Sequence, residues 1–179
     1  MTTDEAQTTR ASTFSWQRIG SQFGFEHLAG LALMSTYVLL LLGAYASAIG
    51  AGLSCLDWPT CYGTWVPFLY PEIVANAPYS ALQIFAEWAH RGLAMIVGFL
   101  ILGTVGVAWR CERDRPLVVW SATLALVVLP VQVVLGGLTV TELLQPAIVT
   151  ARLGTAILIL VALMTTAVTA RLRSRAHVS

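Results

Sequence analysis

The segment Phe85-Ala-Glu-Trp-Ala-His-Arg-Gly-Leu-Ala94 decides how this chain folds. Three ionisable residues, Glu87, His90 and Arg91, interrupt an apolar stretch that is long enough to cross a membrane. Their spacing of three and four residues places them on one face of a helix. An ionisable group in a membrane-spanning helix is costly and faces protein, cofactor or water rather than lipid. We therefore predict that this face looks into the interior of a helix bundle.

The composition indicates an integral membrane protein. Of the 179 residues, 57% are hydrophobic and only 11% are charged, and the mean hydropathy is +0.75. The ten positive side chains are all arginine, and the formal net charge is +1. No basic run lies in a soluble segment, so we expect contact with membrane lipid and no nucleic-acid partner.

The apolar segments predict an all-α polytopic membrane protein, a bundle of four transmembrane helices with a long outer loop between helices one and two. Residues 1 to about 24 are polar and lack the apolar core of a signal peptide, which predicts a disordered or interfacial tail. The helical domain is expected over residues 25–172, followed by a basic tail at 173–179. The expected helices span residues 27–53, 79–109, 117–141 and 146–170, each to within a few residues.

The position of arginine on the short loops and tails predicts the orientation, because arginine is retained on the cytoplasmic side. Eight arginines fall on one side of a four-helix chain, and the other two connections contain none. We expect both termini to be cytoplasmic in a multi-pass protein of the plasma membrane. The loop with Cys55 and Cys61 is then outside, where disulfides persist. The eight are Arg10, Arg18, Arg110, Arg113, Arg115, Arg171, Arg173 and Arg175.

A weak internal repeat relates the two halves of the helical region. The matching segments are Leu42-Gly-Ala-Tyr45 with Leu135-Gly-Gly-Leu138, and His90-Arg-Gly-Leu-Ala94 with Arg152-Leu-Gly-Thr-Ala156. Arg91 and Arg152 each lie 19 residues before the arginine that ends their helix (91 to 110 and 152 to 171), on the order of 28 Å along the axis. We interpret the chain as two helical hairpins of one ancestry, with Arg152 in the place of His90.

His90 is the only histidine in the middle of the sequence. Neutral imidazole ligates haem iron, and a four-helix bundle offers a slot for a flat macrocycle. The alternative is a histidine whose hydrogen bonds are satisfied by a neighbouring polar group. Glu87 could orient that imidazole, act as an acid or base beside a substrate, or simply pair with Arg91.

Arg152 has no neutralising residue one turn away on its own helix. Three alternatives are open: it extends its charge to the outer interface, it pairs with Glu87 or Glu142, or it binds an anion such as a haem propionate. Gln132, in the preceding helix, is a further donor and acceptor for the same network.

Cys55 and Cys61 enclose five residues of a loop that is expected in an oxidising compartment. They could form a disulfide that holds the loop, or a redox-active pair that exchanges electrons with a partner. Metal binding is disfavoured, because no histidine or further cysteine lies near them in the sequence.

Three sequence blocks resemble the heme A synthase family. The first two are Gly52-Leu-Ser-Cys-Leu-Asp-Trp-Pro-Thr-Cys-Tyr-Gly63, similar to the family's GLSCPDWPxCxG loop, and Glu87-Trp-Ala-His-Arg91, similar to its ExxHR motif. Gln132-Val-Val-Leu-Gly-Gly-Leu-Thr-Val140 resembles a third block of the family. The family usually has eight helices in two halves, so the resemblance implies that this chain corresponds to one half, as in compact versions.

The resemblance implies a haem at the outer side of the bundle, with His90 as an axial ligand of the iron and Glu87 as the catalytic carboxylate. Arg91, Arg152 and Gln132 are the further expected haem-binding residues. The implied reaction oxidises a porphyrin methyl of haem O to the formyl of haem A for cytochrome oxidase, with haem B as an alternative bound cofactor. The implied partners are haem O synthase or an oxidase assembly, and a second copy of the chain.

The chain also departs from the family pattern. The family's second histidine begins an HLxxA pattern that here reads Arg152-Leu-Gly-Thr-Ala156, so one axial ligand is missing. Ser47, Ile49 and Leu56 replace the family's arginine, threonine and proline around the cysteine loop. These departures imply an open iron position, ligands shared between two chains, or a lost reaction. The alternative to an enzyme is therefore a non-catalytic haem-binding or structural subunit associated with a respiratory oxidase or its assembly.

Overall fold

The computed structural model describes residues 4–141 and 145–176, and no strand occurs among them. Five α-helices and two short 3-10 helices follow one another along the chain. The α-helices are α1 (Asp4–Ala48), α2 (Pro71–Asn76), α3 (Ala81–Cys111), α4 (Pro116–Thr141) and α5 (Pro146–Ala176), and the 3-10 helices are η1 (Ala51–Leu53) and η2 (Pro67–Leu69).

Four of these helices are long and apolar enough to cross a membrane. The shortest apolar stretch has 25 residues, which at the rise of an α-helix covers about 37 Å, more than the hydrocarbon thickness of a bilayer. The prediction of an all-α bundle with four transmembrane helices is confirmed. The candidate spans are Gly24–Ala48, Ala81–Cys111, Pro116–Val140 and Pro146–Leu172.

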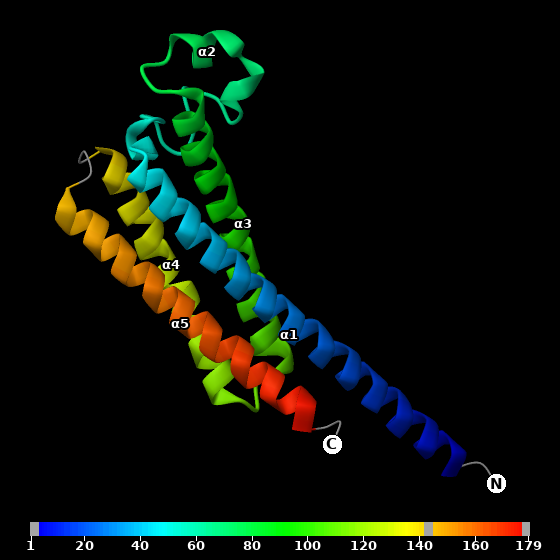
Figure 1. Cartoon of the computed structure of the whole chain (residues 1–179). Helices are drawn as coiled ribbons and strands as arrows, with labels where there is room; N and C mark the ends of the chain where they lie inside the picture. The colour runs from blue at the N-terminus through cyan, green and yellow to red at the C-terminus, as the bar shows by residue number, and fades with distance from the viewer. Residues whose placement is uncertain (1–3, 142–144, 177–179) are drawn as a thin grey trace.

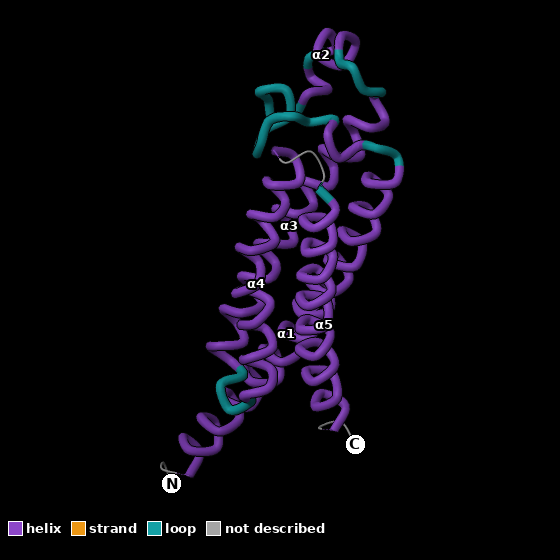
Figure 2. Tube along the Cα trace, turned by 90° about the vertical axis from the view of Figure 1, so that its left-hand side faces the viewer, coloured by secondary structure: helices purple, strands orange, loops and turns teal. Residues whose placement is uncertain are grey.

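The four long helices form a closed ring. Helix α1 packs against α3 and α5, and α4 packs against the same two neighbours, so the order around the bundle is α1, α3, α4, α5. Figure 1 shows both chain ends at one end of the bundle and the segment that contains α2 at the other end. The view turned by 90° shows the same arrangement, with the connection between α1 and α3 standing above the helix ends (Figure 2).

Helix α1 differs from the predicted first helix at both ends. It begins at Asp4, so the described part of the segment expected to be a disordered or interfacial tail is helical, and it projects beyond the other helices (Figure 1). This segment contains no proline, so nothing prevents the helix of the apolar span from continuing into it. The helix ends at Ala48 rather than near residue 53, because Gly50 adopts a φ of 71° that leaves the helical conformation.

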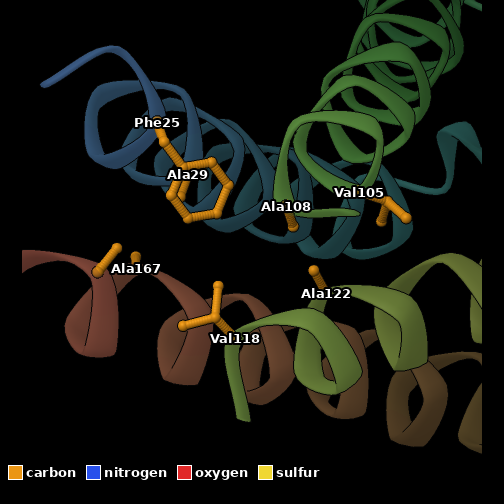
Figure 3. Packing of buried hydrophobic residues seen from close by; sticks show 8 residues of the cluster. Phe25, Ala29, Val105, Ala108, Val118, Ala122 and Ala167 are labelled. Atoms are coloured by element: carbon orange, nitrogen blue, oxygen red, sulfur yellow. The ribbon is translucent and has the colours of Figure 1, made fainter. Parts of the chain in front are cut away.

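Small residues let the helices approach closely near the chain termini. Phe25 of α1 is 1% exposed and lies among alanines and valines that are contributed by all four long helices (Figure 3). Small side chains at helix interfaces permit the close backbone contact on which membrane bundles depend. The cluster consists of Phe25, Ala29, Val105, Ala108, Val118, Ala122, Ala167 and Ala170.

Arg110 in the last turn of α3, and Arg113 and Arg115 in the turn between α3 and α4, lie at the same end of the bundle as the two chain ends (Figure 1). The grouping of arginine-rich segments at one end therefore follows from the fold. Which side of a membrane this end occupies stays a prediction that rests on the charge rule.

Candidate functional site

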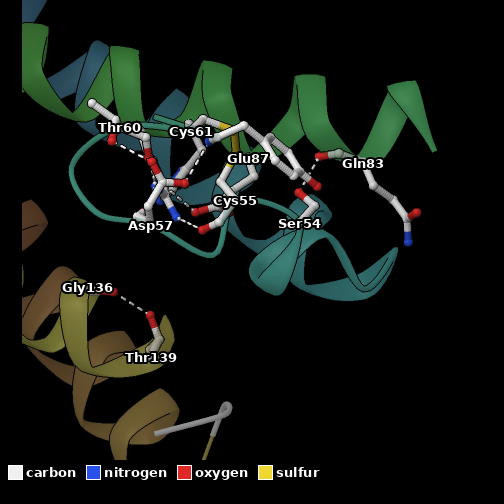
Figure 4. Close-up of polar contacts among 12 residues, drawn as sticks. Ser54, Cys55, Asp57, Thr60, Cys61, Gln83, Glu87, Gly136 and Thr139 are labelled. Atoms are coloured by element: carbon white, nitrogen blue, oxygen red, sulfur yellow. Dashed lines mark hydrogen bonds and ion pairs between the residues drawn. A yellow bond between two sulfur atoms is a disulfide. The ribbon is translucent and has the colours of Figure 1, made fainter. Parts of the chain in front are cut away.

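The first turn of α3 anchors the loop that connects it to α1. Ser80 caps the helix: its hydroxyl accepts from the Gln83 backbone N–H, and the Gln83 side chain accepts from the Ser80 N–H. The Gln83 amide also donates to the Ile49 carbonyl at 2.9 Å, and the Ser54 hydroxyl donates to the Gln83 carbonyl at 3.0 Å (Figure 4). The start of α3 thus fixes both the end of α1 and the beginning of the cysteine loop.

Asp57 organises the cysteine loop internally. Its carboxylate accepts hydrogen bonds from the Thr60 hydroxyl and from the backbone N–H groups of Tyr62 and Gly63. Tyr62 and Gly63 have φ angles of 55° and 73°, the left-handed conformation of a tight turn. Partial burial raises the pKa of Asp57, but these hydrogen bonds outweigh it and hold the pKa below its ordinary value of 3.8.

A disulfide between Cys55 and Cys61 closes this turn, and the bonded sulfurs lie beside α3 (Figure 4). Both cysteines are buried and pack with Ile84, a fully buried residue in the first turn of α3. Farther along the loop, the Trp88 indole donates to the Trp65 carbonyl at 2.7 Å. The loop is therefore an ordered cap that is fastened to one face of α3.

Arg91 connects the cysteine loop to the membrane-spanning part of α3. Its guanidinium donates to the backbone carbonyls of Cys55, Asp57 and Thr60 at 2.5 to 2.6 Å. Its Nε donates to Glu87 Oε1 at 3.0 Å, and the two side chains are only 12% and 10% exposed. One cation thus satisfies three loop carbonyls and one carboxylate.

His90 lies one turn from Glu87, but in a different environment. The residue is 8% exposed, and its ring rests against α1 at Gly43, where a Cβ would lie 2.8 Å from the imidazole Cε1. On the other side, Arg152 donates to His90 Nε2 at 2.8 Å. Because a guanidinium can only donate, Nε2 is the acceptor, and a neutral ring carries its proton on Nδ1.

The second hairpin completes the surroundings of His90. Arg152 of α5 also donates to the hydroxyl of the buried Thr139 of α4, at 3.2 Å. Gln132 links the same two helices, since its amide donates to the Arg152 carbonyl at 3.1 Å and accepts from the Thr155 hydroxyl at 3.0 Å. Glu142, which the sequence suggested as a partner of Arg152, lies outside the described residues.

The structure therefore divides the predicted site residues into two neighbouring networks. Glu87 and Arg91 join the disulfide loop, whereas His90 joins Arg152 and, through the α5 backbone, Gln132. Of the alternatives for Glu87, the pairing with Arg91 is present. Sequence reasoning gave no role to Gly43, Asp57 or Thr139, although Gly43 lies in the internal repeat and Asp57 in the cysteine loop motif.

The fold and the site define a polytopic membrane bundle with ionisable residues gathered at its loop-bearing end. A family model described as cytochrome oxidase assembly protein matches residues 26–179, and this range contains all four candidate spans except two residues of the first. The chain belongs to the heme A synthase family of cytochrome oxidase assembly proteins.

Curated relatives carry two different names. A heme A synthase from Symbiobacterium thermophilum is 33% identical over 129 residues, which cover 68% of this chain and 38% of that protein. A protoheme IX farnesyltransferase from Halobacterium salinarum is 36% identical over 115 residues, 64% of this chain and 22% of that protein. A heme A synthase from Shouchella clausii is 27% identical over 115 residues, 64% of this chain and 35% of that protein. The chain thus matches about a fifth to two fifths of the length of these relatives, and no solved structure matches it.

The residues around His90 suit a haem, the group to which the names of these relatives refer. Nδ1 of His90 is buried against the backbone of α1, and Nε2 carries the lone pair that faces Arg152. A neutral imidazole lone pair is a ligand for haem iron, and a guanidinium is suited to the carboxylates that haem carries. The imidazole of His90 therefore suits the iron of a haem, and the guanidinium of Arg152 suits a haem carboxylate.

Proposed function

We propose that this chain binds haem O through His90 and oxidises a porphyrin methyl group to the formyl group of haem A, for use by cytochrome oxidase. The observation that carries this proposal is the buried imidazole of His90, held at the meeting of α1, α3 and α5 with its lone pair directed at a cation. Bound haem supplies the iron chemistry and the methyl group, while the protein positions the ring.

Each residue of the two networks has a role in this proposal. His90 orients the porphyrin by holding its iron, and Gly43 fixes the plane of the imidazole by allowing it to touch α1. Glu87 would accept a proton released from the methyl group at Oε2, because Oε1 is bound to Arg91. An external electron acceptor would take the four electrons of the oxidation, and water would supply the formyl oxygen. The disulfide of Cys55 and Cys61 is structural and holds the loop carbonyls within hydrogen-bonding distance of Arg91. The loop faces the outer side of the plasma membrane, as the arginine distribution predicts.

A second candidate function is a non-catalytic haem-binding subunit that associates with a respiratory oxidase or with its assembly. It is favoured by Arg152, which stands where the family has its second histidine and donates to the ligand nitrogen of His90. In both candidates the chain works beside haem O synthase, an oxidase assembly or a second copy of itself.

The experiment that tests the proposal is an absorption spectrum of the protein purified in detergent, with the extracted haem identified by its mass. We expect haem O or haem A in the wild type, loss of that haem in His90→Ala, and no loss in the control His27→Ala, which changes an exposed histidine near the opposite end of the bundle. Haem B alone would favour the second candidate. A folded protein with no haem, or haem that survives in His90→Ala, would refute both candidates.

A further inference from the structure

The hydrogen bond between Arg152 and His90 excludes iron binding by the same nitrogen. Nε2 of a neutral imidazole has one lone pair, and in this structure it accepts from Arg152 at 2.8 Å. The other nitrogen, Nδ1, is buried and carries the proton of the neutral ring, and both nitrogens lie near α1, at 3.3 Å (Nδ1) and 3.5 Å (Nε2) from the position that a Cβ on Gly43 would take. Nε2 is therefore the available ligand atom, and Arg152 must leave it before a metal can bind.

Arg152 has no anionic partner among the described residues. Its contacts are the His90 imidazole and the Thr139 hydroxyl, both neutral. Glu87 attracts it only from farther away, because that carboxylate is bound to Arg91 at 3.0 Å. A cation inside a membrane bundle is costly unless it is paired, so a guanidinium released from His90 requires an anion.

Two glycines of the second hairpin have open space at the position of a side chain. A Cβ on Gly136 or Gly137 of α4 would meet nothing within 4 Å, whereas the corresponding Gly43 of the first hairpin touches the His90 ring. Arginine has a long and flexible side chain, and its planar group binds a carboxylate through two parallel hydrogen bonds.

We propose that Arg152 is a carboxylate-binding switch, in which the guanidinium covers His90 Nε2 in the ligand-free chain and moves to a carboxylate of an iron porphyrin when Nε2 takes the iron. This inference rests on the proposed function, since it requires that His90 ligates haem. It adds that the chain recognises a porphyrin by its acid groups, and that the residue in the place of the second histidine performs this recognition.

The test compares two porphyrins that differ only in their acid groups. The full-length chain, purified free of haem in detergent, is titrated with iron protoporphyrin and with its dimethyl ester, and binding is followed by the Soret absorbance. The variants are Arg152→Met, Arg152→Gln and His90→Ala. Because the acid and the ester partition differently into micelles, the ratio of their affinities is compared between chains.

We expect the acid-to-ester affinity ratio to fall about 10-fold to 100-fold in Arg152→Met, the range for one charge-assisted contact. The same variant should bind the ester more tightly than the wild type does, because no guanidinium has to leave Nε2. Arg152→Gln should behave in the same way and replaces Arg152→Met if the latter does not fold. An unchanged ratio in these variants would overturn the switch while leaving haem binding intact. Absence of porphyrin binding by the wild type, or binding that survives in His90→Ala, would instead refute the proposed function and the switch with it.

Discussion

The two helical hairpins place an arginine at the same depth in the bundle but surround it differently. Arg91 of the first hairpin donates to three loop carbonyls and to the carboxylate of Glu87. Arg152 of the second hairpin meets an imidazole and a hydroxyl, and no carboxylate among the described residues. The first cation is paired with a carboxylate and holds the loop in place, whereas the second contacts only neutral groups in the part of the chain that the structure describes.

The glycines at matching positions of the repeat, Gly43 and Gly136, also differ in their surroundings. Gly43 is in contact with the His90 ring, and Gly136 has open space in front of it. The first hairpin is therefore in close contact with its histidine at this position, whereas the matching glycine of the second hairpin has no such neighbour. We infer that ancestry placed similar residues in both hairpins, and that the cysteine loop, which only the first hairpin carries, created the difference.

The largest expected effect comes from Arg91→Met. Its removal leaves a buried carboxylate and three carbonyls without their donor, and breaking a buried ion pair costs about 3 to 5 kcal/mol. Thermal unfolding in detergent measures this loss, with Arg152→Met as the matched variant. We expect Arg152→Met to be far less destabilising, because it strands no charge. Equal destabilisation by the two variants would contradict the conclusion that Arg91 stabilises the fold more than Arg152 does.

A smaller effect is expected from Gly43→Ala. The added Cβ would approach the His90 ring to 2.8 Å, and overpacking of this kind costs about 1 to 3 kcal/mol, so haem affinity should fall about tenfold or more. The matched control is Gly136→Ala, whose Cβ would meet nothing within 4 Å. Haem titration of both variants measures the difference. If Gly136→Ala weakened haem binding as much as Gly43→Ala, the two hairpins would not differ in packing as described.

The joint substitution of Cys55→Ser and Cys61→Ser tests the structural role of the disulfide. Closing so short a loop stabilises the folded state by about 2 kcal/mol in the chain-entropy model. Because Arg91 still holds the loop carbonyls, we expect faster proteolysis of residues 49–80 but retained haem binding. The measurement is limited proteolysis followed by the haem spectrum. Unchanged proteolysis with loss of haem conversion would assign a redox role to the pair instead.

The smallest effect is expected from Asp57→Asn and concerns pH. The folded-state pKa of Asp57 lies below its ordinary value of 3.8, so its ionised form stabilises the loop fully above that pH. This contribution is lost as the pH falls below 3.8 and through the folded-state pKa. Protease sensitivity of the wild-type loop should therefore rise in acid, and Asp57→Asn should be sensitive already at neutral pH and show less pH dependence. If the variant kept the wild-type pH profile, ionisation of Asp57 would not be what stabilises the loop.

The sequence was sufficient for the transmembrane helices and for the family. The charge-free stretches of residues 28–53 and 117–141, together with two apolar segments that contain few ionisable residues, predicted four spans, because hydropathy and helical period are local properties. The cysteine loop and the segment of Glu87, His90 and Arg91 indicated the family that the comparisons then showed. The helix α1 begins at Asp4, within the segment for which a polar tail is predicted, because polar composition alone does not distinguish a tail from a helical extension.

What the sequence by itself determined is the number of spans, the polar face of α3 and the depth at which its ionisable residues lie. Only the tertiary structure decided their partners: Arg91 binds carbonyls of the loop before it, and Arg152 binds His90 across 62 residues of sequence. The physical reason is that a helical period shows which residues share a face, but not which neighbour that face meets. That choice depends on how the helices rotate and pack, and it is a property of the whole bundle.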